Sequence, residues 1–340
     1  MDAVVVIIDS TDSERLDELN YDVIKPALGA DELSNAVFLF LANKCDLPNT
    51  MSSQEISDRL NLKAVKHTCS IIPPWIRGSL YRNGPGMYEV GNTKFNHLFD
   101  PMAIFQRFHV SDGKAYYQCR YLRSDTYNRN MAANRIVVTE VGTVAFPDPC
   151  KNIFQRFLSY FQPNDMPRDN TLVSFYPMKD ELYASTETDA IHKVDPETLD
   201  SLGKVEISKY VAVNMATAHP HWDIDGTLHN IGYSFAKGPK VCLIKFPPKD
   251  RPEDDFTHGE VVASLSPSSK FSINYFHSFA MTENYYIFVA QPVYINLLKV
   301  LVGYFRGVPP NAAIEWWPDI KVFILATEYV CRYVSNPAPT

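Results

Sequence analysis

Residues 103–122, AIFQRFHVSDGKAYYQCRYL, contain two short runs that are apolar or alternate apolar with polar residues, Ala103–Val110 and Ala115–Leu122, separated by the turn-forming SDGK. Runs of this length between turn residues are typical of β-strands. From Ile72 onward the chain shows no helical periodicity, and such runs recur. The further runs are Arg135–Glu140, Leu182–Glu187, Val241–Lys245 and Tyr285–Val289. The pattern therefore predicts a mainly β fold of the propeller or barrel type.

The first 69 residues follow a different pattern, in which two apolar runs alternate with two helical stretches. The apolar runs, Ala3–Ile8 and Val37–Ala42, are rich in β-branched residues, as expected of strands buried on both faces. Because a helical stretch separates them, the two strands are expected to pair in parallel within an α/β sheet.

The two expected helices have recognisable starts. Each start has the pattern of a capping box, Thr11–Glu14 for the first helix and Ser52–Glu55 for the second. Pro26 is expected to end or kink the first helix near Lys25, because proline lacks the N–H that a helix interior requires.

Composition excludes several classes of protein. Of the 340 residues, 46% are hydrophobic and 13% aromatic, which argues against a disordered or fibrous chain. The formal charge of −7, with no cluster of lysine and arginine, argues against a nucleic-acid partner. Six cysteines without a CxxC pair argue against a disulfide framework or a zinc ribbon.

The same sequence indicates a cytoplasmic protein. The apolar run Val4–Ile8 is too short for a signal peptide, and no apolar stretch reaches the roughly 18 residues of a membrane-spanning helix. The cysteine pattern also suits a reducing compartment.

Asn43-Lys44-Cys45-Asp46 follows the second expected strand and resembles the guanine-reading NKxD motif of small GTPases. The wider run NKCDLPNTM is similar to that of Arf proteins, with Cys45 in place of their glutamine. The resemblance implies that Asn43, Lys44 and Asp46 are vestigial nucleotide-binding positions. A bare NKxD motif is also common in helix-capping loops.

No GxxxxGK[ST] phosphate-binding loop occurs in the 340 residues. Most of the binding energy of a nucleotide comes through its phosphates and magnesium. Residues 1–69 are therefore expected to be a partial Arf-type segment of the P-loop GTPase fold, and GTP binding is not expected.

Residues 72–324 resemble the first half of the carotenoid cleavage oxygenases, in particular the animal β-carotene oxygenases and retinoid isomerohydrolases. The resemblance rests on LYRNGPG at Leu80–Gly86, NHLFD at Asn96–Asp100, YLRSDTY at Tyr121–Tyr127 and PDPCK at Pro147–Lys151. It implies an incomplete seven-bladed β-propeller, followed by an unassigned tail at residues 325–340.

Two of these motifs carry local expectations. In LYRNGPG we expect a turn, in which the glycines adopt positive φ and Pro85 fixes the bend. After NHLFD, Pro101 stands where the family has glycine, which removes a backbone donor.

The family holds Fe(II) with four histidines, and by motif His219 in HPH and His277 in YFHSF correspond to the first two of them. Glu187 in STETD corresponds to a carboxylate that orients a ligand imidazole. Because His221 alternates with His219 by two, either could be the ligand. The resemblance implies addition of O₂ across a double bond of a carotenoid or apocarotenoid, with retinyl-ester isomerohydrolysis as the close alternative.

No histidine follows His277, so the chain contains only two of the four iron ligands. We therefore expect the chain as written to hold Fe(II) poorly and to be inactive. The alternatives are a truncated Arf-like GTP-binding protein and a fused or mispredicted gene product without activity.

The stretch CKNIFQRFLSYF, residues 150–161, combines apolar residues with Lys151 and Arg156. On a helix this pattern gives one wide apolar face with a basic rim, as expected of a segment that lies in the membrane interface. An ordinary core helix is the alternative. The expected membrane-contact residues are Cys150, Ile153, Phe154, Phe157 and Leu158.

Overall fold

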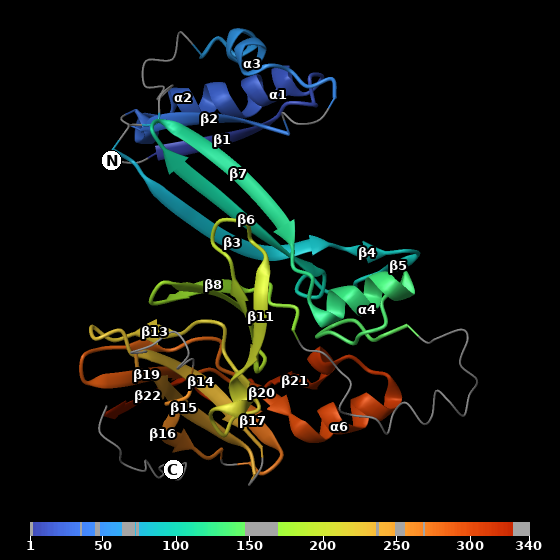
Figure 1. The fold of residues 1–340 in the computed structure, drawn as a ribbon, viewed down its shortest axis with the longest axis vertical. Coiled ribbons are helices and arrows are strands. Elements are labelled where there is room, and N and C mark those ends of the chain that lie inside the picture. Colours follow the sequence, from blue (N-terminus) through green and yellow to red (C-terminus); the bar gives the residue numbers. More distant parts are fainter. Residues whose placement is uncertain are drawn as a thin grey trace. The chain divides into compact units, whose positions relative to one another are not determined.

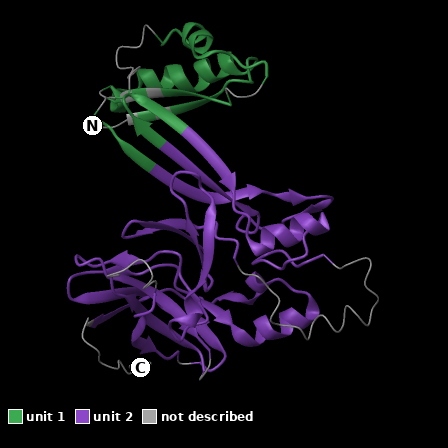
Figure 2. Ribbon diagram, in the orientation of Figure 1, with its two compact units in different colours: residues 1–79, 109–116 green, residues 80–108, 117–340 purple. Residues whose placement is uncertain are grey.

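The computed structural model describes residues 3–34, 36–44, 48–62, 72, 75–146, 169–235, 238–248, 256–267 and 269–328. The chain divides into two compact units, residues 1–79 with 109–116 and residues 80–108 with 117–340 (Figure 2). The described part is mainly β, as the strand pattern predicted (Figure 1).

The first unit contains a two-stranded parallel sheet, β1 Ala3–Asp9 and β2 Val37–Asn43, in the predicted orientation (Figure 1). Its helical segments are α1 Leu16–Leu19, a π-helical turn at Asn20–Ile24, α2 Lys25–Gly29, a 3₁₀ turn at Asp31–Leu33 and α3 Ser53–Arg59. Their apolar faces meet the sheet in a small core formed by Ile8, Leu16, Ile24, Met51, Ile56 and Leu60.

The helix starts agree with the sequence in one case only. Ser52 caps α3, because its side chain accepts a hydrogen bond from the Glu55 N–H at 3.1 Å. The first box does not open a helix, and α1 begins later, at Leu16. The backbone N–H and the hydroxyl of Thr11 both donate to the Asp9 carboxylate instead, which occupies the expected cap.

Pro26 changes the helix without ending it. The Lys25 N–H donates to the Asn20 carbonyl in the π-helical turn, and α2 then continues to Gly29. Pro26 thus lies directly after the π-helical turn, and the helical backbone continues through it.

The strands β6 Met102–Ser111 and β7 Lys114–Tyr121 contain the two strand runs predicted within residues 103–122 and form a hairpin (Figure 1). Asp112 and Gly113 connect them with φ of 50° and 74°. Two residues with positive φ match the twist of a tight hairpin. A third strand, β3 Gly78–Met87, lies at the edge of the same sheet, which has the order β3-β6-β7.

The other strands of the second unit form small sheets. A four-stranded antiparallel meander, typical of a propeller blade, consists of β8 Ser174–Met178, β9 Glu181–Ser185, β10 Ala190–Val194 and β11 Ser201–Glu206. The next sheet contains β12 Met215–Ala216, β13 His221–Trp222, β14 Leu228–Ser234, β15 Lys240–Phe246 and β16 Glu260–Leu265.

Two three-stranded sheets and one two-stranded ladder complete the described strands. The first three-stranded sheet consists of β17 Ser272–Asn274, β20 Val293–Asn296 and β21 Ile314–Trp316. The second consists of β18 Ala280–Met281, β19 Tyr285–Ala290 and β22 Phe323–Glu328. The two-stranded ladder pairs β4 Glu89–Val90 with β5 Thr93–Lys94. The described helical segments of the second unit are α4 Asp125–Ala133, α6 Leu297–Arg306 and 3₁₀ turns at Ile207–Lys209 and Pro310–Ala313.

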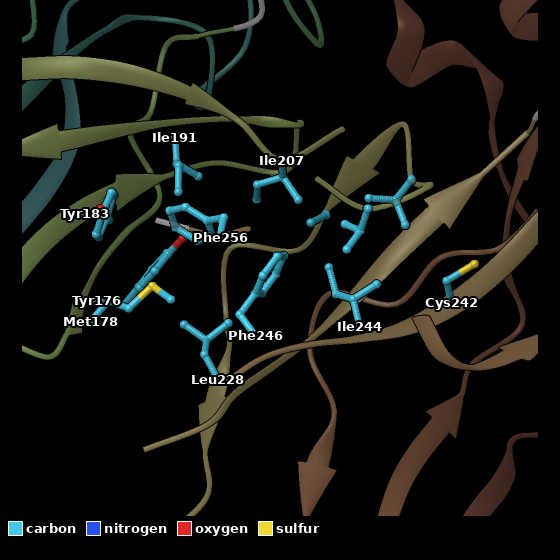
Figure 3. Close-up of a cluster of buried hydrophobic side chains, with 13 residues drawn as sticks. Tyr176, Met178, Tyr183, Ile191, Ile207, Leu228, Cys242, Ile244, Phe246 and Phe256 are labelled. Carbon is cyan, nitrogen blue, oxygen red and sulfur yellow. The ribbon is translucent and has the colours of Figure 1, made fainter. Parts of the chain in front are cut away.

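An aromatic core joins the meander to the sheet that contains β14 and β15 (Figure 3). The Phe256 ring lies edge-on to both Tyr183 and Phe246, with centroids 5.4 and 5.1 Å apart. Such edge contacts add to the stability gained from burying the apolar area. This core therefore fixes the two sheets that carry most of the candidate site.

The LYRNGPG motif is a strand, not the predicted turn. It lies within β3, and neither Gly84 nor Gly86 has positive φ. Pro85 is accommodated because β3 is an edge strand, where a missing N–H is tolerated. Gly86 is required by space, because a Cβ there would lie 2.6 Å from Ile104 Cβ.

Residues 135–140, predicted as a strand, form none. Side chains satisfy their backbone instead: Asn130 Oδ1 accepts from the N–H groups of Val137 and Val138 at 2.7 and 3.2 Å. Thr93 Oγ1 accepts from Ile136 N–H at 2.9 Å. These bonds replace a strand partner.

Hydrogen bonds hold the backbone on both sides of Pro101. The preceding Asp100 is fully buried and accepts hydrogen bonds from Gly142 N–H and the Thr143 hydroxyl at 3.1 and 2.5 Å. The Pro101 carbonyl accepts from Asn170 Nδ2 at 2.9 Å.

No helix in the described ranges is long and apolar enough to span a bilayer.

Candidate metal centre

His219 and His277 meet across an open cleft of the second unit. Their Nε2 atoms are 2.9 Å apart, and the ring centroids are separated by 4.4 Å. His219 lies between β12 and β13, and His277 lies between β17 and β18. The structure thus brings together the two histidines that the motifs singled out, although 58 residues separate them in the sequence.

Buried polar groups fix the backbone at His219. Thr217 Oγ1 donates to Asn230 Oδ1 at 2.6 Å, and Asn230 Nδ2 donates back to the Thr217 carbonyl at 2.7 Å. The hydroxyl of Ser174, on β8, donates to the Ala218 carbonyl. Because these groups are largely shielded from water, their bonds hold the loop in one conformation.

His277 is held by a carboxylate and by its own neighbours. Its Nδ1 lies 2.5 Å from Glu187 Oε1. The Tyr275 hydroxyl donates to the two Glu187 oxygens at 2.8 and 2.9 Å and lies 3.0 Å from His277 Nδ1. The Tyr233 hydroxyl binds the backbone N–H of Phe276 at 2.6 Å. Glu187 therefore contacts one of the two imidazoles that the motifs singled out.

The contact with Glu187 indicates where a neutral His277 ring carries its proton. An ionised carboxylate only accepts, so His277 carries its proton on Nδ1 and presents a bare lone pair at Nε2. Burial and the neighbouring His277 lower the pKa of His219, against the opposite effect of Glu187. A neutral imidazole is the form that binds a metal.

The cleft around the pair has a volume of about 460 Å³, within the range of small-molecule sites. His277 remains half-exposed, with 54% of its side-chain surface accessible. The walls supply aromatic rings and few charges, which suits an apolar ligand. The lining includes Phe175, Tyr176, Trp222 and Phe279.

His221 does not join the pair. Its Nε2 donates to the Phe279 carbonyl at 2.7 Å, and its ring stacks edge-on with Phe279 at 4.6 Å. The expectation that His219 and His221 face the same side assumed one continuous strand. Instead β13 begins only at His221, so the two side chains diverge.

The spacing of the pair fits a shared metal ion. Two imidazole nitrogens at about 2.1 Å from one ion, in neighbouring octahedral positions, lie about 3.0 Å apart. The observed separation is 2.9 Å. Among the described residues, no group of three or more histidine, cysteine, aspartate or glutamate side chains has a metal-binding arrangement. The described part of the cleft therefore offers two nitrogens and one supporting carboxylate.

Sequence reasoning missed Tyr275. Tyr275 is the first residue of the YFHSF motif, two residues before His277, but its hydrogen bonds depend on Glu187, 88 residues earlier in the chain. Burial, followed by Glu187, raises the pKa of the Tyr275 hydroxyl well above its usual range, so the group remains a donor. Only the folded arrangement of these three residues shows its contact.

The nucleotide-type positions are only partly described. Asn43 ends β2, and Lys44 Nζ forms an ion pair with Asp9 Oδ2 at 2.6 Å. This hydrogen bond lowers the pKa of Asp9 to about 2. Asp46 lies outside the described residues, so the assignment of these three residues as vestigial nucleotide-binding positions stays a prediction. The expected membrane segment, Cys150–Phe161 with Ile153, Phe154, Phe157 and Leu158, also lies outside them.

The comparisons with known proteins divide the chain in the same order as the motifs. The family described as "Retinal pigment epithelial membrane protein" matches residues 54–327, and the ADP-ribosylation factor family matches residues 1–90. The first match covers most of the chain. The protein therefore belongs to the retinal pigment epithelial membrane protein family, which is the carotenoid oxygenase family.

Similar curated proteins are carotenoid dioxygenases. The beta,beta-carotene 15,15'-dioxygenase of Gallus gallus is 47% identical over 74% of this chain and 49% of its own length. The enzyme of the same name from Rattus norvegicus is 43% identical over 79% of this chain and 48% of its own length. The mitochondrial carotenoid-cleaving dioxygenase of Macaca fascicularis is 46% identical over 73% of this chain and 45% of its own length. The chain thus spans about half the length of the curated relatives it matches.

The fold agrees with this family. A mutant of the Synechocystis apocarotenoid oxygenase superposes with a TM-score of 0.59, at 21% identity, over 76% of this chain and 51% of that one. The carotenoid-oxygenase fold that the motifs implied is thereby confirmed for the matched part.

Proposed function

We propose that this chain contributes to Fe(II)-dependent oxidative cleavage of a carotenoid or apocarotenoid double bond, with His219 and His277 as iron ligands. The observation that carries the proposal is the 2.9 Å approach of the two Nε2 atoms at an aromatic cleft. The sequence identity to carotenoid dioxygenases supports a carotenoid or apocarotenoid as the substrate class of this chain.

Each residue of the site has a distinct part in this proposal. Fe(II), when bound, supplies the chemistry that brings O₂ to a double bond. Glu187 keeps the proton of His277 on Nδ1 and leaves Nε2 free for the metal. The Thr217–Asn230 pair holds the backbone before His219, which limits movement of the second imidazole.

The cleft walls would bind the polyene. Trp222 and Tyr176 lie with ring centroids 6.2 Å apart, and Phe279 lies behind His221. Flat apolar rings give contact area to a conjugated chain without requiring hydrogen bonds. A retinyl ester would fit the same kind of wall, and the products formed would distinguish cleavage from isomerohydrolysis.

The remaining proposals concern the rest of the chain. Residues 1–69 are a partial Arf-like segment that does not bind GTP, and residues 72–324 are part of a seven-bladed propeller. Residues 325–340 are an unassigned tail whose first residues, 325–328, complete strand β22. The protein is cytoplasmic, with peripheral membrane contact through residues 150–161. The parallel β1–β2 pair supports the first of these proposals.

Polyene binding tests the substrate class. Retinol fluorescence, excited directly, should rise saturably with the wild-type chain. Trp222→Lys removes an aromatic wall and adds a charge, so the apparent Kd should increase about tenfold or more, the loss expected when apolar contact is replaced by a charge. Trp316→Lys is the matched control, because Trp316 is 64% exposed and does not line the cleft.

The two variants separate the possible results. Weakened binding by Trp222→Lys together with wild-type binding by Trp316→Lys supports the cleft as the polyene site. If both variants bind retinol like the wild type, the cleft is not that site and the substrate proposal is wrong.

A further inference from the structure

Tyr275 lies at the centre of the contacts on the His277 side of the cleft. One hydroxyl reaches both Glu187 oxygens, at 2.8 and 2.9 Å, and lies 3.0 Å from His277 Nδ1. In the described part of the chain, the hydrogen bonds to the Glu187 carboxylate come from Tyr275 and His277. The phenol is thus the only fixed donor to that carboxylate besides the imidazole itself, within those residues.

We propose that Tyr275 is a positioning residue for His277. Its hydroxyl holds the Glu187 carboxylate where Oε1 accepts the Nδ1 proton, which selects the tautomer with a free Nε2. The inference rests on the proposed function in one respect, the role of His277 as a metal ligand. The tautomer itself can be measured without metal.

The geometry explains why Glu187 requires this support. Its side chain is 26% accessible and has three rotatable bonds, so water competes for its oxygens. Holding such a side chain with a single hydrogen bond to His277 would leave it free to rotate. A hydroxyl shared between both oxygens limits that rotation and leaves Oε1 facing the imidazole.

The two halves of the candidate site differ in how they are held. His219 follows a loop fixed by the buried Thr217–Asn230 pair, which does not depend on Tyr275. The His277 ring, in contrast, is oriented through an accessible carboxylate. Loss of the Tyr275 hydroxyl should therefore change His277 and leave His219 in place.

Tyr275→Phe removes this hydroxyl and nothing else. Tyr286→Phe is the matched control, because its hydroxyl also contacts a histidine, at 2.8 Å from His229 Nδ1, but in the buried core outside the cleft lining. Both variants lose one phenol–imidazole contact. Only Tyr275→Phe should affect His277.

The first measurement is the tautomer of His277 by ¹⁵N NMR of histidine-labelled, metal-free full-length protein at pH 8. The wild type and Tyr286→Phe should show His277 protonated on Nδ1. Tyr275→Phe should show a mixture of both tautomers. A pure Nδ1 tautomer in Tyr275→Phe would overturn the inference.

The second measurement is anaerobic Co(II) titration of the same proteins, followed by the visible absorption of the bound metal. Tyr275→Phe should weaken Co(II) binding about tenfold, the lower limit for loss of a residue that orients a ligand. Glu187→Gln should weaken it similarly, and adding Tyr275→Phe to Glu187→Gln should cause no further loss, because the tyrosine acts through the carboxylate.

The two proposals fail separately. If His277→Ala abolishes Co(II) binding but Tyr275→Phe binds like the wild type, the positioning role is wrong and the metal site stands. If His277→Ala binds Co(II) like the wild type, the metal site is wrong. Additive losses in the Glu187→Gln, Tyr275→Phe double variant would also overturn the positioning role.

Discussion

Asp169 shows how much a single buried carboxylate can hold in place. It is 1% exposed and accepts hydrogen bonds from the N–H groups of Asp125 and Thr126, at 2.8 and 3.1 Å, and from the Thr126 hydroxyl at 2.9 Å. Burial raises the pKa of Asp169, but the nearby His192 and these donors outweigh it and leave the pKa well below its usual range. The carboxylate thus anchors the start of α4.

Asp169→Asn should destabilise the second unit by about 1–3 kcal/mol, because an amide cannot accept from all these donors. Since the folded pKa is lowered, the contribution of Asp169 is fully present above its unfolded pKa of about 3.9 and is lost as the pH falls below that value. Urea unfolding followed by tryptophan fluorescence would measure both effects. A gap between the two proteins that does not shrink from pH 6 to pH 3 would contradict this account.

Single residues also show what the sequence could reveal about the site. His219, His277 and Glu187 could be named from motifs. In the structure His277 lies within hydrogen-bond distance of both His219 and Glu187. Tyr275 and Asp169 could not, because their partners lie 88 and 43 residues away and no local pattern connects them. Motifs identify residue types at fixed spacing, whereas such contacts arise only on folding.

Among the elements, β3 contains a position where close packing leaves room only for glycine. Gly84 and Gly86 both lie in this strand with ordinary extended backbone, so conformational freedom does not distinguish them. A Cβ on Gly84 would meet nothing within 4 Å. A Cβ on Gly86 would lie 2.8 Å from the Tyr121 ring, as well as against Ile104.

These neighbouring glycines form a matched pair for mutation. Gly86→Ala should destabilise the second unit by about 1–3 kcal/mol, because the methyl group forces the packed strands apart. Gly84→Ala should change the stability by no more than about 0.5 kcal/mol. Chemical denaturation of both variants is the measurement. Equal stability of the two would show that the packing of β3 is not tight.

The elements also show where strand prediction succeeds and fails. The runs that became β6, β7, β15 and β19 were found within one or two residues, because short apolar or alternating runs between turn residues are typical of strands. Residues 135–140 have the same pattern but are paired by Asn130 and Thr93 side chains. A run of this kind does not reveal which groups satisfy the hydrogen bonds of its backbone.

For the whole molecule, the two units have separate apolar cores, one around Ile8 and Ile56 and others in the sheets of the second unit. The candidate metal site belongs to the second unit alone. Two imidazoles bind a divalent ion more weakly than four, so the 340-residue chain should retain well under one iron per chain after gel filtration. At equilibrium, however, binding should still be saturable.

Anaerobic equilibrium dialysis against Fe(II), with iron measured by mass spectrometry, tests the central claim most directly. The wild type should bind no more than one iron per chain with a single saturable phase. His219→Ala and His277→Ala should each remove that phase, whereas His221→Ala should retain it, because His221 Nε2 is already bonded to the Phe279 carbonyl. Saturable binding of wild-type strength in the His219→Ala, His277→Ala double variant would contradict the account.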